Sequence, residues 1–515
     1  MKHFLLVGGI VLSFVLSGCE GKQVPDTPPS PTPTDTEVAD KEGYTVKGLV
    51  TCGGKALPGV IVSDGVNVTQ TNLEGKYWMK TDERSDFVFL TIPSGYEVPL
   101  KGNNPQFYHR LKPVSEGVQR FDFSLTATDN QRYELLVFTD IHISARTTPL
   151  CLDSDRFTRA ALADLKAYVA TRPYGTKFYG LSLGDQVQDS YIKDSGLPEF
   201  LDVMSPVPFP MFYIVGNHDH LPDAPLAEDE NARSLKAYYM DHLGPTYYSF
   251  NLGKVHYVVL DNNMMLGGGT NKYRCRVPQQ QLDWMAKDLA KVDKSMKLVV
   301  CLHQPIVHNA TDSGASLKVA SSCENYQDIA NACAGFGSIE IFTGHSHFAE
   351  VVNWSARFTQ TTHPSACGVW WLSKFCHDGT PAAYTRYEVD GTEMRRSLMA
   401  YDYPAHPQVF VHTEGVTDPD GKPAIQFSVP FYGNGWKVRV MENGAEVAQA
   451  RRVLGTDWYY EHTEYPAQPA FQQKYATVQP RKTWHIFYYT PVDPSASVEV
   501  EATDPWGRKG LVYAL

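Results

Sequence analysis

The sequence predicts an α/β protein with a β domain at each end of the chain. Short β-rich runs separated by Gly-Gly, Asp-Gly and Glu-Gly turns fill residues 43–126, and apolar strands alternate with helical patterns from Tyr133 onward. After Gly391 the helical pattern fades, and β-rich runs alternate with Gly, Pro and Asn-Gly turns. At 515 residues, 43% of them hydrophobic, the chain is long enough for several domains of about 150 residues, each with its own core.

Residues 1–18 predict an export signal. The apolar run from Phe4 to Leu16 follows Lys2 and is shorter than the roughly 20 residues that a membrane-spanning helix needs. It ends in Leu-Ser-Gly-Cys, which resembles the lipobox of bacterial lipoproteins, so Cys19 is the expected site of lipidation. The alternative is an ordinary export signal with an unrelated cysteine.

The segment 19–41, which begins with the lipidated cysteine, predicts an extended tether. Its prolines stand among Thr, Ser and Asp, a composition that buries no core. We therefore expect an exported lipoprotein that the membrane holds through its lipid anchor. Glu20 differs from the aspartate that signals inner-membrane retention, which favours the outer membrane.

Charge and cysteine usage narrow the classes of partner and cofactor. The net charge of −11 disfavours nucleic acid as the main partner, because affinity for phosphate backbones rests on clustered Lys and Arg. The cysteines after Cys19 form no Cys-x-x-Cys pair, which excludes a zinc ribbon and a dithiol redox site.

The elements predict three folded domains in order. Residues 42–127 form an N-terminal β-sandwich, residues 131–390 a catalytic domain and residues 391–515 a C-terminal β domain. The strands expected in the central domain are Leu135–Thr139, Phe178–Leu183, Phe209–Val215, Tyr247–Phe250, Val255–Leu260, Leu298–Leu302 and Ile339–Phe342, with helices near Asp155–Thr171 and Pro278–Val292.

Five segments that carry His, Asp or Asn come directly after predicted strands of the central domain. In an open α/β sheet the carboxyl ends of the strands meet at one crevice, so these side chains can share a site. Oxygen and imidazole ligands without thiolates suit Mn, Fe, Zn or Mg. The segments are Asp140-Ile141-His142, Gly184-Asp185-Gln186-Val187-Gln188-Asp189, Gly216-Asn217-His218-Asp219, His303 and Gly344-His345-Ser346-His347.

This ordered set, DxH, GDxxxD, GNHD, H and GHxH, resembles the calcineurin-like metallophosphoesterase superfamily over roughly residues 133–386. The segments 59–77 and 504–508 resemble the N- and C-terminal modules of its exported members. The resemblance implies a central β-sandwich flanked by helices. It also implies a cofactor of two divalent metal ions. Carried over, metal one is held by Asp140, His142, Asp185 and His347, and metal two by Asp185, Asn217, His303 and His345.

Two such ions can lower the pKa of a bridging water, which then attacks phosphorus in line. By the same resemblance His218 stabilises or protonates the leaving oxygen, and Asp219 orients the His218 ring. Two further residues are candidate substrate contacts: His220, otherwise a hydrogen-bonded loop histidine, and Arg146, otherwise a solvated loop arginine. The segment 261–263 either rims the site or is a plain loop, and we favour the loop.

The expected function is hydrolysis of phosphoesters in the cell envelope. A diester is favoured over a monoester, because the GNHD arrangement is also that of diesterases. The competing hypothesis is a surface lipoprotein that uses this fold as a scaffold and binds a glycan or a partner through its aromatic β domains, although fold alone never proves activity. The complete set of ligand residues counts against it. A dinuclear peptidase or amidase fits the metals but not the GNHD and GHxH motifs.

Overall fold

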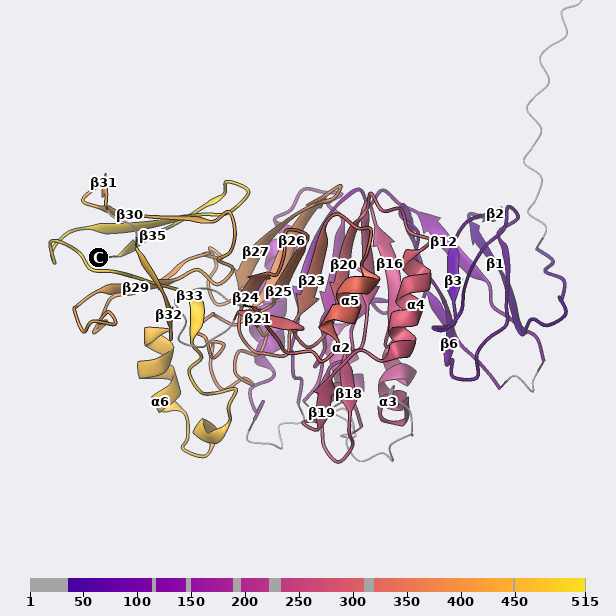
Figure 1. Cartoon of the computed structure of the whole chain (residues 1–515), viewed down its shortest axis with the longest axis horizontal. Coiled ribbons are helices and arrows are strands. Elements are labelled where there is room, and N and C mark those ends of the chain that lie inside the picture. The colour runs from indigo at the N-terminus through magenta and orange to yellow at the C-terminus, as the bar shows by residue number, and fades with distance from the viewer. Residues whose placement is uncertain are drawn as a thin grey trace, which may run out of the picture.

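A computed structural model describes residues 36–113, 117–144, 150–188, 196–221, 233–309, 319–447 and 450–514. It shows a row of three β-rich units, with the N-terminal β domain at one end and the C-terminal β domain at the other (Figure 1). The export signal, Cys19 and most of the tether lie outside the described residues. Within these residues, every helix is too short or too polar to cross a membrane.

The N-terminal domain consists of two sheets, of strand order β11-β1-β12-β7 and β10-β6-β3-β4, with β2 and β5 attached to β1. Its core is continuous with that of the central domain. Across the junction the Trp284 indole donates to the hydroxyl of Ser63 at 2.9 Å, and the hydroxyls of Thr91 and Ser249 lie 2.8 Å apart. The strands are β1 (Val46–Cys52), β2 (Lys55–Ala56), β3 (Ile61–Ser63), β4 (Val68–Gln70), β5 (Lys76–Met79), β6 (Phe87–Leu90), β7 (Tyr96–Glu97), β8 (Leu100–Lys101), β9 (Asn104–Pro105), β10 (Tyr108–Arg110), β11 (Gln119–Arg120) and β12 (Phe123–Ala127).

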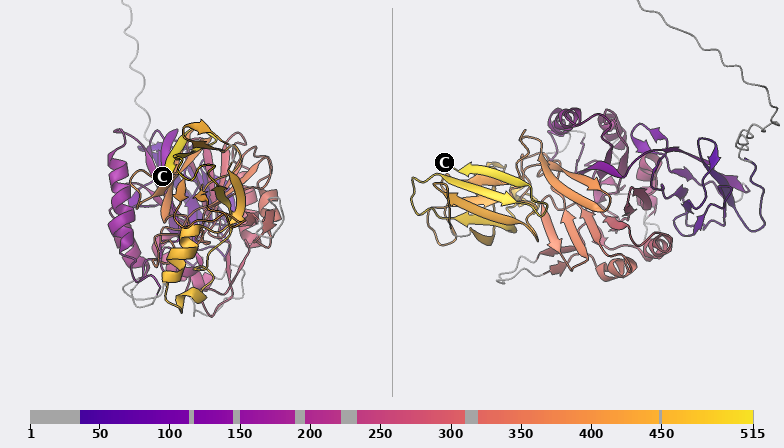
Figure 2. Two further views of the ribbon diagram at one scale, coloured as in Figure 1. Left: turned by 90° about the vertical axis from the view of Figure 1, so that its left-hand side faces the viewer. Right: turned by 90° about the horizontal axis from the view of Figure 1, so that it is seen from above.

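The central domain is a sandwich of two sheets, ordered β15-β14-β13-β26-β27 and β16-β17-β20-β23-β25-β24. Its apolar strands are buried, as the sequence predicts, and helices cover both outer sides (Figure 2). The predicted fold class is therefore confirmed. The strands are β13 (Arg132–Phe138), β14 (Phe178–Ser182), β15 (Met211–Tyr213), β16 (Tyr248–Leu252), β17 (Val255–Val259), β18 (Asn263–Met265), β19 (Tyr273–Cys275), β20 (Lys297–Cys301), β21 (Val307–Asn309), β22 (Val319–Ser321), β23 (Ile339–Thr343), β24 (Glu350–Asn353), β25 (Phe358–Thr362), β26 (Ala383–Asp390) and β27 (Glu393–Ala400).

Five helices accompany these strands within the described ranges. The helix expected near residues 155–171 begins as a π-helical turn, Phe157–Ala161, and continues as α1. The helices are α1 (Leu162–Ala170), α2 (Leu197–Met204), α3 (Arg233–Leu243), α4 (Gln279–Leu289) and α5 (Tyr326–Ala332).

The domain boundary predicted at residue 391 is wrong. β26 and β27 form an antiparallel hairpin in which Ala383 pairs with Ala400, and β26 also pairs with β13. Gly391, at φ 62°, makes the turn of that hairpin. The turn signal at Gly391 therefore lies inside the catalytic sheet, and the C-terminal domain begins after Ala400.

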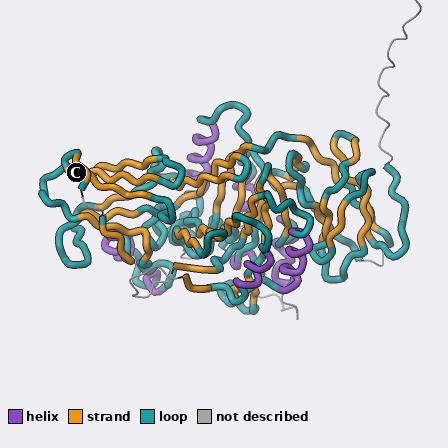
Figure 3. Tube along the Cα trace, turned by 45° about the horizontal axis from the view of Figure 1, so that its top comes forward, coloured by secondary structure: helices purple, strands orange, loops and turns teal. Residues whose placement is uncertain are grey.

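The C-terminal domain packs two four-stranded sheets around a core that includes Phe427 and Phe487 (Figure 3). Residues 456–482, between β32 and β33, carry short helical turns and return to the central domain, where Tyr460 and Val478 pack on Val369. The elements are β28 (Phe410–His412), β29 (Ile425–Ser428), β30 (Lys437–Glu442), β31 (Ala445–Glu446), β32 (Arg451–Gly455), α6 (Tyr465–Ala467), β33 (Thr483–Tyr489), β34 (Val498–Thr503) and β35 (Lys509–Ala514).

Candidate metal centre

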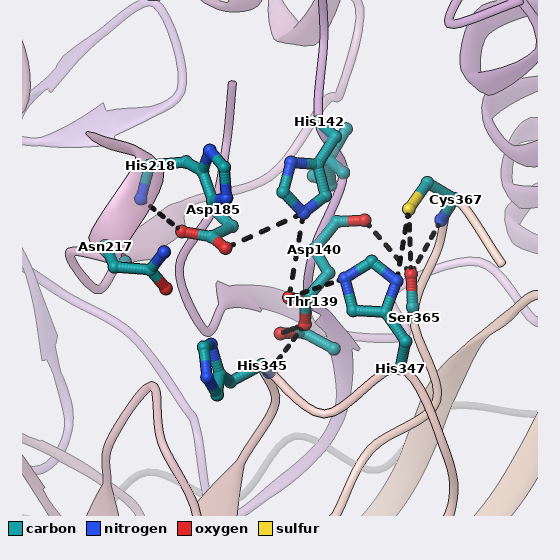
Figure 4. A network of polar contacts seen from close by, with 12 residues as sticks. Thr139, Asp140, His142, Asp185, Asn217, His218, His345, His347, Ser365 and Cys367 are labelled. Atoms are coloured by element: carbon teal, nitrogen blue, oxygen red, sulfur yellow. Dashed lines mark hydrogen bonds and ion pairs between the residues drawn. The ribbon is translucent and has the colours of Figure 1, made fainter. Parts of the chain in front are cut away.

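The seven metal-ligand candidates meet at one edge of the two central sheets. Each follows the carboxyl end of a strand, namely β13, β14, β15, β20 or β23. Figure 4 shows most of these side chains turned toward one another across the space between the two sheets. The candidates are Asp140, His142, Asp185, Asn217, His303, His345 and His347.

The backbone at this edge is strained. All but two of the candidates adopt the left-handed conformation, with φ between 49° and 65°. Residues other than glycine rarely adopt it, and such strain persists where the surrounding structure imposes it, commonly at functional sites. The strained candidates are Asp140, His142, Asp185, His345 and His347.

The first group of ligand atoms surrounds the position expected for metal one. His347 Nε2 lies 3.3 Å from Asp140 Oδ1. His142 Nε2 lies 3.9 Å from the same oxygen and 3.6 Å from Asp185 Oδ2. Both ring nitrogens of His142 are buried without a hydrogen-bond partner. Because an unpaired buried imidazole is costly, a metal ion is the partner that this geometry fits.

The second group shares Asp185 with the first. Asp185 Oδ2 lies 3.3 Å from His303 Nε2, which in turn lies 3.1 Å from both Asn217 Oδ1 and His345 Nδ1. The Asp185 carboxylate therefore faces both groups and can bridge two ions.

Hydrogen bonds from Nδ1 to backbone carbonyls fix the orientation of two of the histidine rings. His303 Nδ1 lies 2.8 Å from the Leu183 carbonyl, and His347 Nδ1 lies 2.7 Å from that of Gly368. A ring whose Nδ1 donates in this way keeps Nε2 as the metal-binding nitrogen. Both rings therefore point Nε2 at the other ligand atoms.

The electrostatics of the site favour the ligand form of His142, His345 and Asp185. Burial lowers the pKa of His142 and of His345 to about 3, so both rings are neutral at physiological pH. Burial opposes ionisation of Asp185, but the charges of His303 and His218 hold the pKa of that carboxyl well below its usual range. Neutral imidazole and ionised carboxylate are the forms that bind divalent metals.

His218 lies beside the ligands, but Asp219 does not orient its ring. The Nδ1 of His218 lies 2.7 Å from the Gln188 carbonyl, and a ring nitrogen of His218 lies within 4.8 Å of ligand atoms of His142 and Asp185. The Asp219 carboxylate accepts from the backbone N–H groups of Gly216, Asp185, Gln186 and Val187. It thereby ties the GDxxxD loop to the GNHD loop. The expected role of Asp219 is corrected accordingly: the turn at 217–219 points neighbouring side chains in different directions.

The two predicted substrate contacts are His220 and Arg146. His220 is fully buried and its Nδ1 lies 2.8 Å from the Gly216 carbonyl, as in the alternative of a hydrogen-bonded loop histidine. Arg146, together with Asp189, lies outside the described residues.

The segment 261–263 is more than the plain loop that we favoured. Its side chains are buried, and Asn263 donates to the Val215 carbonyl, just before the GNHD motif, at 3.0 Å. It leads into the β18–β19 hairpin, whose Thr270 carbonyl accepts from Asn217 Nδ2 at 3.1 Å and whose Tyr273 hydroxyl lies 2.8 Å from His345 Nε2. No motif in the sequence indicated these contacts.

A second supporting segment, residues 365–371, also carries no motif. The Trp371 indole donates to the Ile141 carbonyl at 2.9 Å, and the backbone N–H of Ala366 donates to the Thr139 carbonyl at 2.9 Å. The Trp370 ring packs edge-on against His347 with 5.8 Å between centroids. The φ of both tryptophans is positive, so the segment is strained where it supports the DxH loop. The Trp-Trp pair is the only sequence feature that could have marked it.

Three family models match the chain in order. The N-terminal domain of calcineurin-like phosphoesterases matches residues 44–128, the calcineurin-like phosphoesterase domain residues 133–349, and the C-terminal domain of calcineurin-like phosphoesterases residues 361–509. The chain belongs to the calcineurin-like phosphoesterase family. This confirms the family predicted from the five motifs, with two divalent metal ions as its cofactor.

Individual relatives are more distant. A 3',5'-cyclic adenosine monophosphate phosphodiesterase of Haemophilus influenzae is 28% identical over 188 residues, which are 36% of this chain and 60% of that protein. Purple acid phosphatase 15 of Arabidopsis thaliana is 29% identical over 149 residues, 28% of this chain and 25% of that protein. The chain thus spans less than two thirds of either relative.

Solved structures resemble about half of the chain, and only loosely. A dimetal phosphatase from Danio rerio is 15% identical, with a TM-score of 0.36, over 52% of this chain and 96% of that one. The calcineurin-like phosphoesterase YfkN from Bacillus subtilis is 14% identical, with a TM-score of 0.30, over 53% of this chain and 91% of that one.

Proposed function

We propose that the protein is a dinuclear-metal hydrolase of the cell envelope that acts on phosphodiesters in preference to phosphomonoesters. Two bound divalent ions supply an activated water and positive charge for the phosphoryl oxygens. Asp185 is shared between the two groups of ligands, and His142, His303 and His345 have ring nitrogens that face them.

The observation that carries the preference for a diester is the GNHD segment, in which His218 lies beside the ligands with its Nδ1 2.7 Å from the Gln188 carbonyl. The relative that is a 3',5'-cyclic adenosine monophosphate phosphodiesterase, 28% identical over 188 residues, supports the same preference. A phosphomonoester brings a second negative charge on its terminal oxygens, which Arg or Lys commonly neutralises, whereas a diester brings one. The Tyr273 phenol, an uncharged donor beside His345, suits the diester.

His218 is placed to act on the leaving group. Its Nδ1 is engaged by the Gln188 carbonyl, so Nε2 remains for the leaving oxygen, and the side chain keeps 6% of its surface exposed at the site. A positioned histidine of this kind typically contributes about 10²- to 10⁴-fold to the rate.

The experiment compares bis-p-nitrophenyl phosphate with p-nitrophenyl phosphate, with Mn, Zn, Mg or a chelator, for the soluble chain from Glu20 onward. We expect metal-dependent turnover with the diester preferred, a loss of about 10²-fold or more in His218→Ala, and full activity in the control His462→Ala, a solvent-exposed histidine of the C-terminal domain. If the protein binds two ions but turns over neither ester, the hypothesis of a phosphodiesterase that accepts generic substrates is refuted. Absence of bound metal by elemental analysis would favour the scaffold hypothesis.

We further propose that the protein is exported and anchored to the outer membrane through Cys19. The apolar run that ends in Leu-Ser-Gly-Cys and the proline-rich segment behind it support this proposal. The Cys19→Ala chain should lose labelled fatty acid and leave the membrane fraction. Retention of the label in that variant would contradict lipidation at this cysteine.

A further inference from the structure

The β18–β19 hairpin covers the metal-two side of the site and contacts two of its ligands from outside. The Thr270 carbonyl accepts from Asn217 Nδ2, which leaves Asn217 Oδ1 for the metal. The Tyr273 hydroxyl lies 2.8 Å from His345 Nε2, and the two rings meet edge-on at 80° with 5.5 Å between centroids. One short hairpin therefore orients both ligands.

The hairpin is held at its base by buried bonds. Gln304, next to the ligand His303, donates its amide to Asn263 Oδ1 at 2.7 Å, and the Asn262 amide donates to the Gln304 carbonyl at 2.8 Å. At the other end the backbone N–H of Glu324 donates to the Cys275 carbonyl at 2.9 Å. These bonds therefore fix the backbone of the hairpin that carries Tyr273.

The contact with His345 determines the direction in which the phenol donates. His345 Nδ1 lies 3.1 Å from His303 Nε2 and so faces the other ligands. When Nδ1 binds a metal, Nε2 carries the ring hydrogen and donates it to the Tyr273 oxygen. The phenol then acts as an acceptor toward His345, and its own hydrogen remains available.

That hydrogen has no acceptor among the residues that the structure describes, and the Tyr273 side chain is partly exposed at the site. A phenol is an uncharged hydrogen-bond donor. A donor fixed on the metal-two side, with its oxygen already held by His345, is preorganised for an anionic oxygen.

We propose that Tyr273 donates its phenolic hydrogen to a non-bridging oxygen of the substrate's phosphoryl group. The inference rests on the proposed function and deepens it, because a neutral donor adds recognition without the second positive charge that a phosphomonoester would require.

Tyr273→Phe removes the hydroxyl and keeps the ring, and Tyr174→Phe, at a fully exposed tyrosine, is the matched control. Three quantities are measured: kcat/KM for methyl p-nitrophenyl phosphate, the affinity of the Mn²⁺-loaded protein for inorganic phosphate by calorimetry, and the affinity of the metal-free protein for Mn²⁺. We expect Tyr273→Phe to lower kcat/KM about 10- to 100-fold and phosphate affinity about fivefold or more. Both are measured at saturating Mn²⁺, so that any weaker Mn²⁺ binding through His345 is separated from the loss of phosphate binding.

Two results would overturn the proposal. A fall of about 10- to 100-fold in Mn²⁺ affinity, with phosphate affinity intact at saturating Mn²⁺, would show that Tyr273 only orients His345. Unchanged phosphate affinity and unchanged Mn²⁺ affinity would show that the phenol neither binds the phosphoryl group nor supports metal binding through His345. If wild type fails to turn over the diester, the proposed function fails, and the phosphate-binding comparison still decides the role of Tyr273.

Discussion

Replacing Asp219 with Asn tests the corrected role of this residue. Its carboxylate uses both oxygens: Oδ2 accepts from the N–H groups of Gly216 at 2.8 Å and Asp185 at 3.0 Å, and Oδ1 accepts from those of Gln186 at 3.0 Å and Val187 at 3.4 Å. Asparagine keeps one oxygen and replaces the other with an amide nitrogen. Whichever way the amide turns, its N–H₂ group faces two backbone donors.

Each buried N–H group left without an acceptor costs about 1–3 kcal/mol, so Asp219→Asn should lower the free energy of unfolding by about 2–6 kcal/mol. The same bonds join the loop that carries Asp185 to the loop that carries Asn217. Their loss should therefore also weaken Mn²⁺ binding, by about 10- to 100-fold, as is typical when groups that orient metal ligands are removed.

The matched control is Asp64→Asn in the N-terminal domain. Asp64 is 3% exposed, and its carboxylate also accepts from four groups: the backbone N–H of Val66, of Asn67 and of Asp82, and the Asn67 amide. Urea unfolding followed by fluorescence should show a loss of stability in both variants. Calorimetric titration should show weakened Mn²⁺ binding only in Asp219→Asn.

The reasoning would be refuted if Asp219→Asn bound Mn²⁺ as tightly as Asp64→Asn while losing activity as His218→Ala does. That pattern would mean that Asp219 acts through the His218 ring after all.

Two further predictions concern packing and pH. Gly184→Ala should weaken Mn²⁺ binding at least about tenfold, because its φ is 105° and a Cβ there would lie 2.4 Å from His303 Nδ1. Gly175→Ala, at φ 88° with open space around the Cβ, should leave Mn²⁺ binding unchanged, and equal binding in both variants would contradict this account. Burial lowers the pKa of His363 in the folded chain to about 3. Its contribution to stability is therefore complete above the unfolded pKa of about 6.5 and is lost as pH falls toward 3, by about 2 kcal/mol between pH 8 and pH 5. Wild type should lose that much more stability than His363→Gln over this interval in urea unfolding, and parallel pH profiles would count against it.

Much of the fold and of the metal centre could be predicted because the relevant signals are local. Each ligand motif adjoins a short apolar run, and such runs become buried strands whose carboxyl ends share one edge. Asp140 and His142 follow β13 directly, and His303 follows β20 in the same way. The residue types then determine the chemistry, since carboxylate, amide oxygen and imidazole are ligands for divalent ions.

Contacts between distant segments could not be predicted in this way. The residues around Gly391 predict only a turn. The pairing of β26 with both β13 and β27 shows that the catalytic sheet continues to Ala400. Asp219 is adjacent to His218 in the chain, yet its carboxylate lies against the backbone of residues 185–187.

The sequence by itself determined the family, its cofactor of two divalent ions and the side chains that meet at one edge of the sheets, because those depend on side-chain type and on position at the end of a strand. The tertiary structure decided which groups hold those ligands in place. Tyr273 reaches His345 across 72 residues, and the Trp371 indole reaches the Ile141 carbonyl across 230. A hydrogen bond forms wherever the fold brings donor and acceptor together, and at such separations neither partner leaves a local pattern in the chain.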